Sequence, residues 1–337
     1  MAYTPEEKRY TNGMSYSYCG KSGLMLPKIS LGLWHNFGHV DDFQKSKDVI
    51  HFAFDHGVTH FDLANNYGPP AGSAEENFGS IFKSDLAAHR DEIIVSTKAG
   101  HEMWAGPYGD GSSRKNLIAS LNQSLKRLQM DYVDIFYSHR YDGITPIEET
   151  IQTLIDIVKS GKALYAGISK YPPHLAEKAY KMMEAQGVHC LIHQDRYNLF
   201  SREVEEGTLE TAERNGVGFS AFSPLAQGML TDRYLNGIPE DSRVARNGFL
   251  KKEQITAEKL EIIKQLNMIA LDRGESLAQM ALSWVVSDKR VTTVIVGASS
   301  VNQLAGSLGT LDSPKLSETD LKLVREIVEK DQSNMPK

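Results

Sequence analysis

Apolar residues follow two alternating patterns along the chain: short apolar or β-branched runs, and longer stretches with a helical period. The short runs lie at residues 31–34, 59–62, 93–98, 132–137, 163–169, 191–194, 217–222 and 293–296. Several of them are almost continuously apolar, which is typical of parallel strands that are buried on both faces. The pattern therefore predicts eight short buried strands.

The stretches between these runs have the spacing of amphipathic helices. Residues 113–128 carry one apolar stripe at Leu117, Leu121, Leu125 and Leu128. A second stripe follows at Ile151, Leu154, Ile155 and Val158. The start of the second helix is predicted at Thr145, because residues 145–148 read Thr-Pro-Ile-Glu, a capping box with proline in the first turn.

Glycines mark where several helices end. Each stands directly before a predicted strand, where a left-handed residue can close a helix; they are Gly57, Gly161, Gly187 and Gly216. Strand and helix thus alternate eight times, with no linker rich in proline or serine. This order predicts one (β/α)8 barrel, or TIM barrel, as a single domain over residues 1–337.

Two segments depart from a minimal barrel. Residues 15–26 are typical of a β-hairpin, and we expect it to close the bottom of the barrel. The interval between the seventh and eighth strands is about twice the usual spacing, and it contains a loop at 231–246 followed by a helical region from Thr256. Extra segments of a barrel usually lie at its functional face, so the loop is a candidate lid and extra C-terminal helices are expected.

Composition narrows the class of protein. With 41% hydrophobic and 24% charged residues, a globular core is expected. The net charge of -6 offers no basic surface for nucleic acid. Residues 1–11 are polar, without the apolar region of a signal peptide, and no stretch approaches the ~18 apolar residues of a membrane span. Two distant cysteines give no disulfide framework. A cytoplasmic protein without nucleic-acid or membrane partners is expected.

Some motifs resemble binding sites but lack the necessary context. Residues 20–22 read like the end of a P-loop, but the first glycine of that motif would fall at Ser15. Residues 216–221 satisfy a loose dinucleotide fingerprint, yet they open a strand instead of leading into a helix. His51, His56 and His60 do not converge on one face and are interpreted as solvated or capping. No metal site is predicted.

Chemistry in a barrel enzyme lies at the C-terminal ends of the strands. Asp62 ends the second predicted strand, with Tyr67 five residues later; Lys98 ends the third, and the fourth leads into His139. A lysine ammonium beside a phenol lowers its pKa, and an aspartate can hold that lysine in place. A histidine can polarise a carbonyl oxygen. Together these groups make a proton donor that faces a carbonyl.

Each of these four residues has a structural interpretation when it is taken singly. Asp62 could cap a turn, Lys98 could be solvated, His139 could be a structural hydrogen bonder and Tyr67 could simply pack. The four types at successive strand ends favour catalysis. Because none of them supplies electrons, a hydride carrier is implied.

The sequence resembles the aldo-keto reductases along almost its whole length. The segments that carry the resemblance are residues 59–68, 93–98, 131–139, 167–169, 222–228 and 297–299. The resemblance implies a (β/α)8 barrel that binds a nicotinamide cofactor without a Rossmann domain. It also implies Asp62, Tyr67, Lys98 and His139 as the catalytic residues, with Tyr67 as the acid.

Finer features are similar to one branch of this family. Residues 31–38, 67–75 and 103–109 look like the L-glyceraldehyde 3-phosphate reductase branch, which is related to the β-subunits of voltage-gated potassium channels. That branch implies reduction of small aldehydes, such as glyceraldehyde 3-phosphate and methylglyoxal, to alcohols. It also implies a homo-oligomer, either a tetramer or an octamer.

The resemblance assigns further site residues by position. Phe222 would stack on the nicotinamide, a role that a flat aromatic ring can fill, and Arg233 and Arg243 would reach the phosphates. The other expected cofactor contacts are Trp34, Asp62, Ser169, Gln194, Ser223, Leu225, Gln227, Gly228, Gly297, Ser299, Gln303 and Ser307. The substrate pocket would be formed by Trp34, Tyr67, Trp104, Tyr108 and His139.

One cofactor segment departs from the family. Residues 297–307 hold no Arg or Lys, although a 2′-phosphate normally needs a cation. NADP(H) is predicted, with Arg233, Arg243 or Arg246 as the cation, and NAD(H) stays open. Lys170 is a second departure, and it is close enough to touch cofactor or an anionic substrate.

Two other functions stay open. One is a redox-sensing nicotinamide-binding module, like a channel β-subunit, with little turnover. The other is a non-redox barrel such as a lyase or isomerase, which would need a different base.

Overall fold

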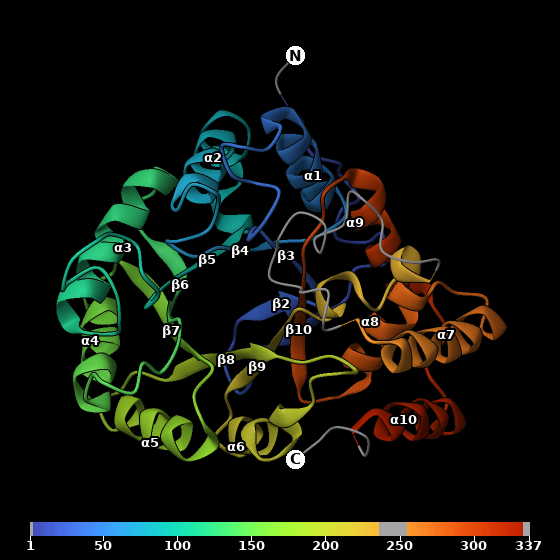
Figure 1. Ribbon diagram of the computed structural model, residues 1–337. Helices are drawn as coiled ribbons and strands as arrows, with labels where there is room; N and C mark the ends of the chain where they lie inside the picture. The colour runs from blue at the N-terminus through green and yellow to red at the C-terminus, as the bar shows by residue number, and fades with distance from the viewer. Residues whose placement is uncertain (1–2, 236–254, 333–337) are drawn as a thin grey trace.

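The computed structural model describes residues 3–235 and 255–332 of the 337-residue chain. Eight parallel strands close into a barrel in the order β10-β3-β4-β5-β6-β7-β8-β9 (Figure 1). The strands are β3 (Ile29–Gly32), β4 (His60–Asp62), β5 (Ile94–Ala99), β6 (Val133–Ser138), β7 (Ala163–Ser169), β8 (Cys190–Arg196), β9 (Gly218–Phe222) and β10 (Val291–Val296). The predicted (β/α)8 barrel is confirmed.

The first barrel strand begins two residues earlier than the apolar pattern predicts. Ile29 and Leu31 pair with Val294 and Val296 of β10, and Ser30 lies between them. Ser30 is fully buried, with its hydroxyl hydrogen-bonded to other polar side chains. A polar residue at an inward position therefore hid the start of the strand, and Trp34 lies beyond its end.

Helices surround the barrel and extend it on one side. They are α1 (Phe43–Asp55), α2 (Ser73–Ile81), α3 (Arg114–Leu128), α4 (Ile147–Lys159), α5 (Pro173–Glu184), α6 (Thr208–Arg214), α7 (Ala257–Asp272), α8 (Leu277–Ser287), α9 (Val301–Leu308) and α10 (Glu318–Gln332). Helices α7 and α10 pack against one another, beyond α8 (Figure 1). The expected C-terminal helices are thus present.

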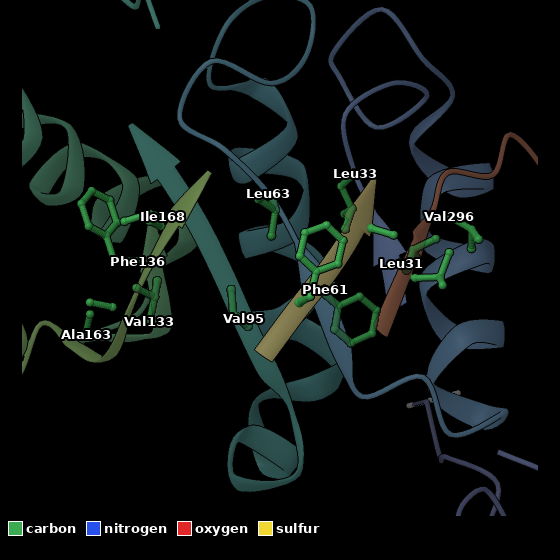
Figure 2. Packing of buried hydrophobic residues seen from close by; sticks show 14 of the residues in the cluster. Leu31, Leu33, Phe61, Leu63, Val95, Val133, Phe136, Ala163, Ile168 and Val296 are labelled. Atoms are coloured by element: carbon green, nitrogen blue, oxygen red, sulfur yellow. The ribbon is translucent and has the colours of Figure 1, made fainter. Parts of the chain in front are cut away.

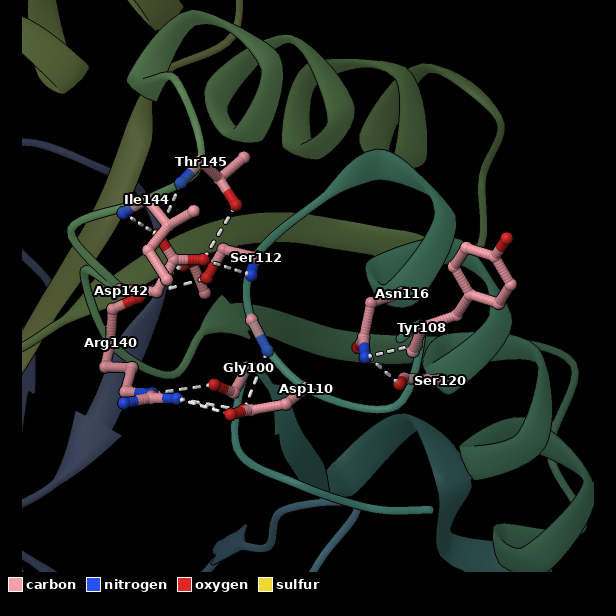
Figure 3. Close-up of polar contacts among 12 residues, drawn as sticks. Gly100, Tyr108, Asp110, Ser112, Asn116, Ser120, Arg140, Asp142, Ile144 and Thr145 are labelled. Atoms are coloured by element: carbon pink, nitrogen blue, oxygen red, sulfur yellow. Dashed lines mark hydrogen bonds and ion pairs between the residues drawn. The ribbon is translucent and has the colours of Figure 1, made fainter. Parts of the chain in front are cut away.

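Local signals at helix ends are confirmed except in one place. Gly57, Gly161, Gly187 and Gly216 all have positive φ angles, as the closing residue of a helix requires. The capping box at Thr145 is wrong: the first residue of α4 is Ile147, and Pro146 precedes it. The Thr145 hydroxyl instead donates to Asp142 Oδ2 at 2.7 Å, so it is not available to cap the helix (Figure 3).

The N-terminal hairpin lies at the bottom of the barrel, as expected. Strand β1 (Tyr16–Tyr18) pairs antiparallel with β2 (Met25–Pro27). In the turn between them, the Lys21 amide donates to the carbonyl oxygen of Gly216 at 2.8 Å, and Cys19 Sγ donates to that of Leu191. Both acceptors lie at the N-terminal ends of strands, opposite the end where the candidate residues lie.

Outward-facing strand residues and the helices form the hydrophobic core. Figure 2 shows Leu31, Phe61, Val95 and Val296 among these packed side chains, and the Phe61 ring lies 5.3 Å from that of Phe78 on α2. Successive residues of a strand point to opposite faces. The positions between the core residues therefore point into the barrel, and several of them are polar.

Candidate active site

The four residues predicted for catalysis meet at the C-terminal end of the barrel. Asp62 is the last residue of β4, Lys98 lies in β5 and His139 directly follows β6. Tyr67 stands in the loop after β4, with its ring centre 5.1 Å from Lys98 Nζ and 5.9 Å from the centre of the His139 ring. The fold therefore brings together side chains that are up to 77 positions apart in the sequence.

Lys98 and Asp62 form a buried ion pair. Lys98 Nζ donates to Asp62 Oδ2 at 2.6 Å and to the carbonyl oxygen of Leu63 at 2.6 Å. The side chain of Lys98 is 0% exposed and that of Asp62 is 3% exposed. Burial lowers the pKa of Lys98, and the Asp62 carboxylate opposes that shift. A buried charge normally requires such a partner.

The electrostatic balance at Tyr67 differs from the expectation. Burial, and then the Asp62 carboxylate, raise the pKa of the Tyr67 phenol well above its ordinary value. Lys98 is not among the causes of this shift, so the expected lowering by Lys98 is not seen. The phenol is therefore protonated at neutral pH, which is the state of a proton donor.

His139 is neutral for an equally physical reason. Burial is the main cause that holds its pKa well below the ordinary value, and the charge of Lys98 adds to it. Its ring lies nearly perpendicular to the ring of His101, with centres 4.5 Å apart. Its Nδ1 is buried without a hydrogen-bond partner in the described part of the chain. A neutral imidazole keeps one N–H that can donate to an oxygen.

A line of hydrogen bonds inside the barrel ends at Asp62. Ser96 Oγ donates to Asp62 Oδ1 at 2.6 Å, since an ionised carboxylate can only accept. His60 Nε2, 2.9 Å from the same Ser96 oxygen, must then be a donor, and its Nδ1 accepts from Ser30 Oγ at 2.9 Å. Ser30 in turn accepts from Thr293 Oγ1 at 2.6 Å. Every donor in the line therefore points toward Asp62.

His60 corrects the interpretation of the histidines. It is 0% exposed, and burial lowers its pKa to about 4, so it is neither solvated nor capping. Its position two residues before Asp62 is the signal that was missed. Side chains two apart on a strand point the same way, so His60 had to share the barrel interior with Asp62.

Comparison with known proteins places the chain in a family. Residues 28–329 match the aldo/keto reductase family. The chain belongs to the aldo/keto reductases. It is 54% identical over 326 residues to the L-glyceraldehyde 3-phosphate reductase of Escherichia coli O157:H7, covering 95% of this chain and 94% of the relative. It is 38% identical to a probable voltage-gated potassium channel subunit beta of Oryza sativa subsp. japonica, covering 89% and 92%.

This membership fixes the class of reaction. An aldo/keto reductase with these relatives is an oxidoreductase that acts on aldehydes, and the family uses nicotinamide cofactors. The remaining candidate residues can therefore be tested for their fit to a nicotinamide and to a small aldehyde.

Three candidate cofactor residues lie at or near the C-terminal ends of strands on the far side of the barrel from β4. Ser169 is the last residue of β7, Gln194 lies in β8 and Phe222 ends β9. Ser169 Oγ is buried without a hydrogen-bond partner among the described residues. Gln194 Nε2 donates to Asp62 Oδ1 at 3.2 Å. A polar ligand that contacted Ser169 Oγ would satisfy an atom that the protein leaves unpaired, so these residues fit the carboxamide of a nicotinamide ring.

The loop after β9 has an unusual backbone. Ser223, Ala226 and Gln227 adopt positive φ angles of 52°, 46° and 59°. Such conformations are uncommon outside glycine and cluster at ligand sites. The loop contains the candidates Leu225 and Gly228 and leads to Thr231, so its geometry agrees with a segment shaped by cofactor binding.

The segment after β10 is a helix start closed by its own side chains. Gln303 Oε1 accepts hydrogen bonds from the Ser299 amide at 2.8 Å and from the Ser299 hydroxyl at 3.0 Å. Gly297 precedes this turn, and Ser307 Oγ donates to the carbonyl oxygen of Gln303 within α9. Backbone amides at a helix start favour an anion without any basic side chain.

The candidate substrate wall is brought together only in part. The Trp34 ring centre lies 6.4 Å from that of Tyr67, which places it beside the four residues. Trp104 and Tyr108 lie in the loop after β5, and the Tyr108 side chain is 60% exposed and directed away from Arg140 (Figure 3). Within residues 3–235 and 255–332, neither ring stacks on one of the four residues.

Part of the candidate lid lies outside the described residues. Arg233 lies in a short 3-10 helix, Asp232–Tyr234. Arg243, Arg246 and residues 236–246 of the candidate lid fall outside the described ranges. In the part of the chain that is described, no group of three His, Cys, Asp or Glu side chains could hold a metal ion. No described helix is both long and apolar enough to cross a membrane.

Proposed function

We propose that this protein reduces small aldehydes, such as glyceraldehyde 3-phosphate and methylglyoxal, to alcohols with NADPH. The observation that carries the proposal is the convergence of Tyr67, His139 and the Lys98–Asp62 pair at one end of the barrel. Bound NADPH would supply the hydride, with Ser169, Gln194 and Phe222 at its nicotinamide. The aldehyde oxygen would face Tyr67 and His139.

The protein residues would move the proton and hold the carbonyl. Neutral His139 would donate a hydrogen bond to the aldehyde oxygen and polarise the carbonyl. Tyr67, protonated because burial raises its pKa, would give its proton to the same oxygen as negative charge develops there. The Lys98 ammonium would then stabilise the resulting phenolate, while Asp62 keeps that ammonium in place.

Removing the proton of Tyr67 tests the assignment. Tyr67→Phe keeps the ring but removes the hydroxyl, and we expect kcat for methylglyoxal to fall by roughly 10²–10⁴. NADPH oxidation followed by absorbance measures the rate, and a binding titration should give the same Kd for NADPH in both proteins. If the wild type is as slow as the variant, the reductase proposal fails.

NADP(H) is proposed over NAD(H) because two features can take a phosphate. The start of α9 carries the positive end of the helix dipole, which favours an anion, and Arg233, in the segment after β9, is a candidate cation. Direct comparison of dissociation constants for NADPH and NADH decides the matter, and tighter binding of NADH would refute the proposal.

A second function is favoured by one observation. The 38% identity to a probable potassium channel subunit beta supports a redox-sensing module that binds nicotinamide and docks a partner. Slow turnover in the wild type together with tight NADPH binding would favour it.

We further propose that the protein is a single-domain, cytoplasmic homo-oligomer, either a tetramer or an octamer. Light scattering would measure the size of this oligomer.

A further inference from the structure

Cationic side chains gather at the rim above the four residues. Lys170 directly follows β7, and its Nζ lies 5.2 Å from the centre of the Phe222 ring. Arg196 is the last residue of β8, and its Cζ lies 6.0 Å from the same ring. Arg140 follows His139 on the neighbouring strand end. Three consecutive strands, β6, β7 and β8, thus each contribute a cation to one side of the site.

The charges of Lys170 and Arg196 are balanced only in part, because the single Asp195 carboxylate interacts electrostatically with both of them. Over the ranges that the structure describes, neither side chain makes an ion pair or a hydrogen bond, and both are exposed. The nearest acid in sequence, Asp195, accepts from the backbone amide of Arg196 instead. Arg140 differs, because it donates to both carboxylate oxygens of Asp110 and to the Gly100 carbonyl (Figure 3).

The backbone holds Lys170 in an unusual conformation. Its φ angle is 56°, in the left-handed region that residues other than glycine rarely adopt. The Lys170 amide donates to the carbonyl oxygen of Gln194 at 3.1 Å, which fixes the turn to β8. Strained conformations of this kind are kept where the surrounding structure needs the side chain in one direction. The direction here carries the ammonium over the ring of Phe222.

The field of Lys170 reaches the centre of the site. After burial, the positive charge of Lys170 is among the causes that lower the pKa values of His101 and His139, as it is for Lys98. Partial loss of solvent is the main cause that lowers the pKa of Lys170, the charge of Arg196 adds to this shift, and the Asp195 carboxylate opposes it. These cations repel one another in a protein whose net charge is -6. An anion held between them would relieve the repulsion.

We propose that Lys170 and Arg196 bind the anionic tail of the aldehyde, a phosphate monoester, while its carbonyl faces Tyr67 and His139. The proposal rests on the proposed reduction of glyceraldehyde 3-phosphate and adds the residues that would bind its phosphate. A lysine offers a point charge and an arginine a planar fork, and both suit a phosphate. Because Arg140 is paired with Asp110, the two side chains that would bind the phosphate are Lys170 and Arg196.

The phosphates of the cofactor are not the expected occupant. Their candidate contacts follow β9 and β10, at Arg233 and the start of α9. Lys170 follows β7, next to Ser169, where the nicotinamide end is expected. An anion at Lys170 therefore belongs to the other reactant.

Kinetics with a matched pair of aldehydes test this subsite. The full-length protein with saturating NADPH is assayed on glyceraldehyde 3-phosphate and on glyceraldehyde, which differ only in the phosphate. Lys170→Met and Arg196→Met should each raise KM for the phosphorylated aldehyde roughly tenfold or more, since hydrogen bonds to charged groups are the strong ones. KM for glyceraldehyde and kcat for both should stay within about twofold. Lys264→Met, which removes an exposed lysine from α7, is the matched control.

Three results would overturn the subsite. In the first, the wild type uses both aldehydes with equal kcat/KM. In the second, Lys170→Met lowers kcat/KM for both aldehydes to the same extent. In the third, Lys170→Met weakens NADPH binding and leaves the ratio of kcat/KM between the two aldehydes unchanged. The last result would assign Lys170 to the cofactor.

A binding measurement separates failure of the subsite from failure of the proposed reaction. Glycerol 3-phosphate and glycerol are titrated calorimetrically into the complex of the protein with NADP⁺. Tighter binding of glycerol 3-phosphate, lost in Lys170→Met and weakened by added salt, supports the subsite even without turnover. Equal binding by the wild type and Lys170→Met refutes it, even if the protein proves to be an active reductase.

Discussion

Removing Lys98 should leave a carboxylate buried without its main partner. In the wild type, Asp62 Oδ2 accepts from Lys98, and Oδ1 accepts from Ser96 and Gln194. Lys98→Met therefore removes the donor to Oδ2 while the side chain of Asp62 stays 3% exposed. Breaking a buried ion pair by removing one partner costs about 3–5 kcal/mol. We expect the lower end, about 3 kcal/mol, because two donors to Oδ1 remain.

The assay is urea unfolding of a double-mutant cycle. Asp62→Asn in the Lys98→Met background removes the stranded charge, so the double variant should be more stable than Lys98→Met by about 2 kcal/mol. Lys178→Met, which breaks the exposed pair with Glu148, serves as the control and should leave unfolding unchanged within error. A Lys98→Met protein within 1 kcal/mol of the wild type, or a double variant no more stable than the single one, would refute the reasoning.

Lys98→Met also tests the link between the ion pair and Tyr67. Loss of the ammonium leaves the developing phenolate without a nearby cation, so kcat for methylglyoxal should fall by roughly 10²-fold or more. Binding of NADPH should be largely unchanged, because Lys98 contacts Asp62 and Leu63. Unchanged kcat would show that Tyr67 does not depend on Lys98.

Two further predictions concern parts of the fold that position the site. Burial lowers the pKa of His60 from 6.5 to about 4. Unfolding therefore takes up a proton between these pH values. As the pH drops from 6.5 to 4, the free energy of unfolding of the wild type should fall by about 3 kcal/mol more than that of His60→Gln. Equal pH dependence of the urea midpoints would contradict the burial of a neutral His60. At the bottom of the barrel, Gly20 has φ +57°, and an added Cβ would lie 2.0 Å from the Gly216 carbonyl oxygen. Gly20→Ala should therefore lower the free energy of unfolding in urea by about 2 kcal/mol or more and leave kcat unchanged. Gly23→Ala, where a Cβ would meet nothing within 4 Å, should be neutral, and equal losses in both variants would rule out the contact.

The strands were predictable because their outward faces are strongly apolar. The first one was misplaced by two residues, since Ser30 points inward to His60 and Thr293 and interrupts the apolar run. The same cause hid the role of His60. A period of two, rather than a continuous run, carries the information about the interior: His60 and Asp62 alternate with Phe61 and Leu63.

Other errors arose where a distant residue decides a local structure. A Thr-Pro-Ile-Glu segment is a good local signal for a cap, but Asp142 takes the Thr145 hydroxyl through a turn that the pattern does not report. The pKa of Tyr67 is a similar case. Proximity to Lys98 suggests a lowered pKa, yet burial and the negative charge of Asp62 raise the pKa of Tyr67.

Charge is distributed differently at the two depths of the site. Inside the barrel, Asp62 receives donors from Lys98, Ser96 and Gln194, so the interior charges are paired and their fields largely cancel. At the rim, no described residue forms an ion pair or a side-chain hydrogen bond with Lys170 or Arg196, and Asp195 balances their charges only in part. A neutral carbonyl group can therefore enter the interior, where the charges are already paired, without leaving a buried charge unpaired. A phosphate, by contrast, would be stabilised only by the cations at the rim. This separation orients an anionic aldehyde with its carbonyl inward, because the reverse orientation would bury a phosphate beside the Asp62 carboxylate.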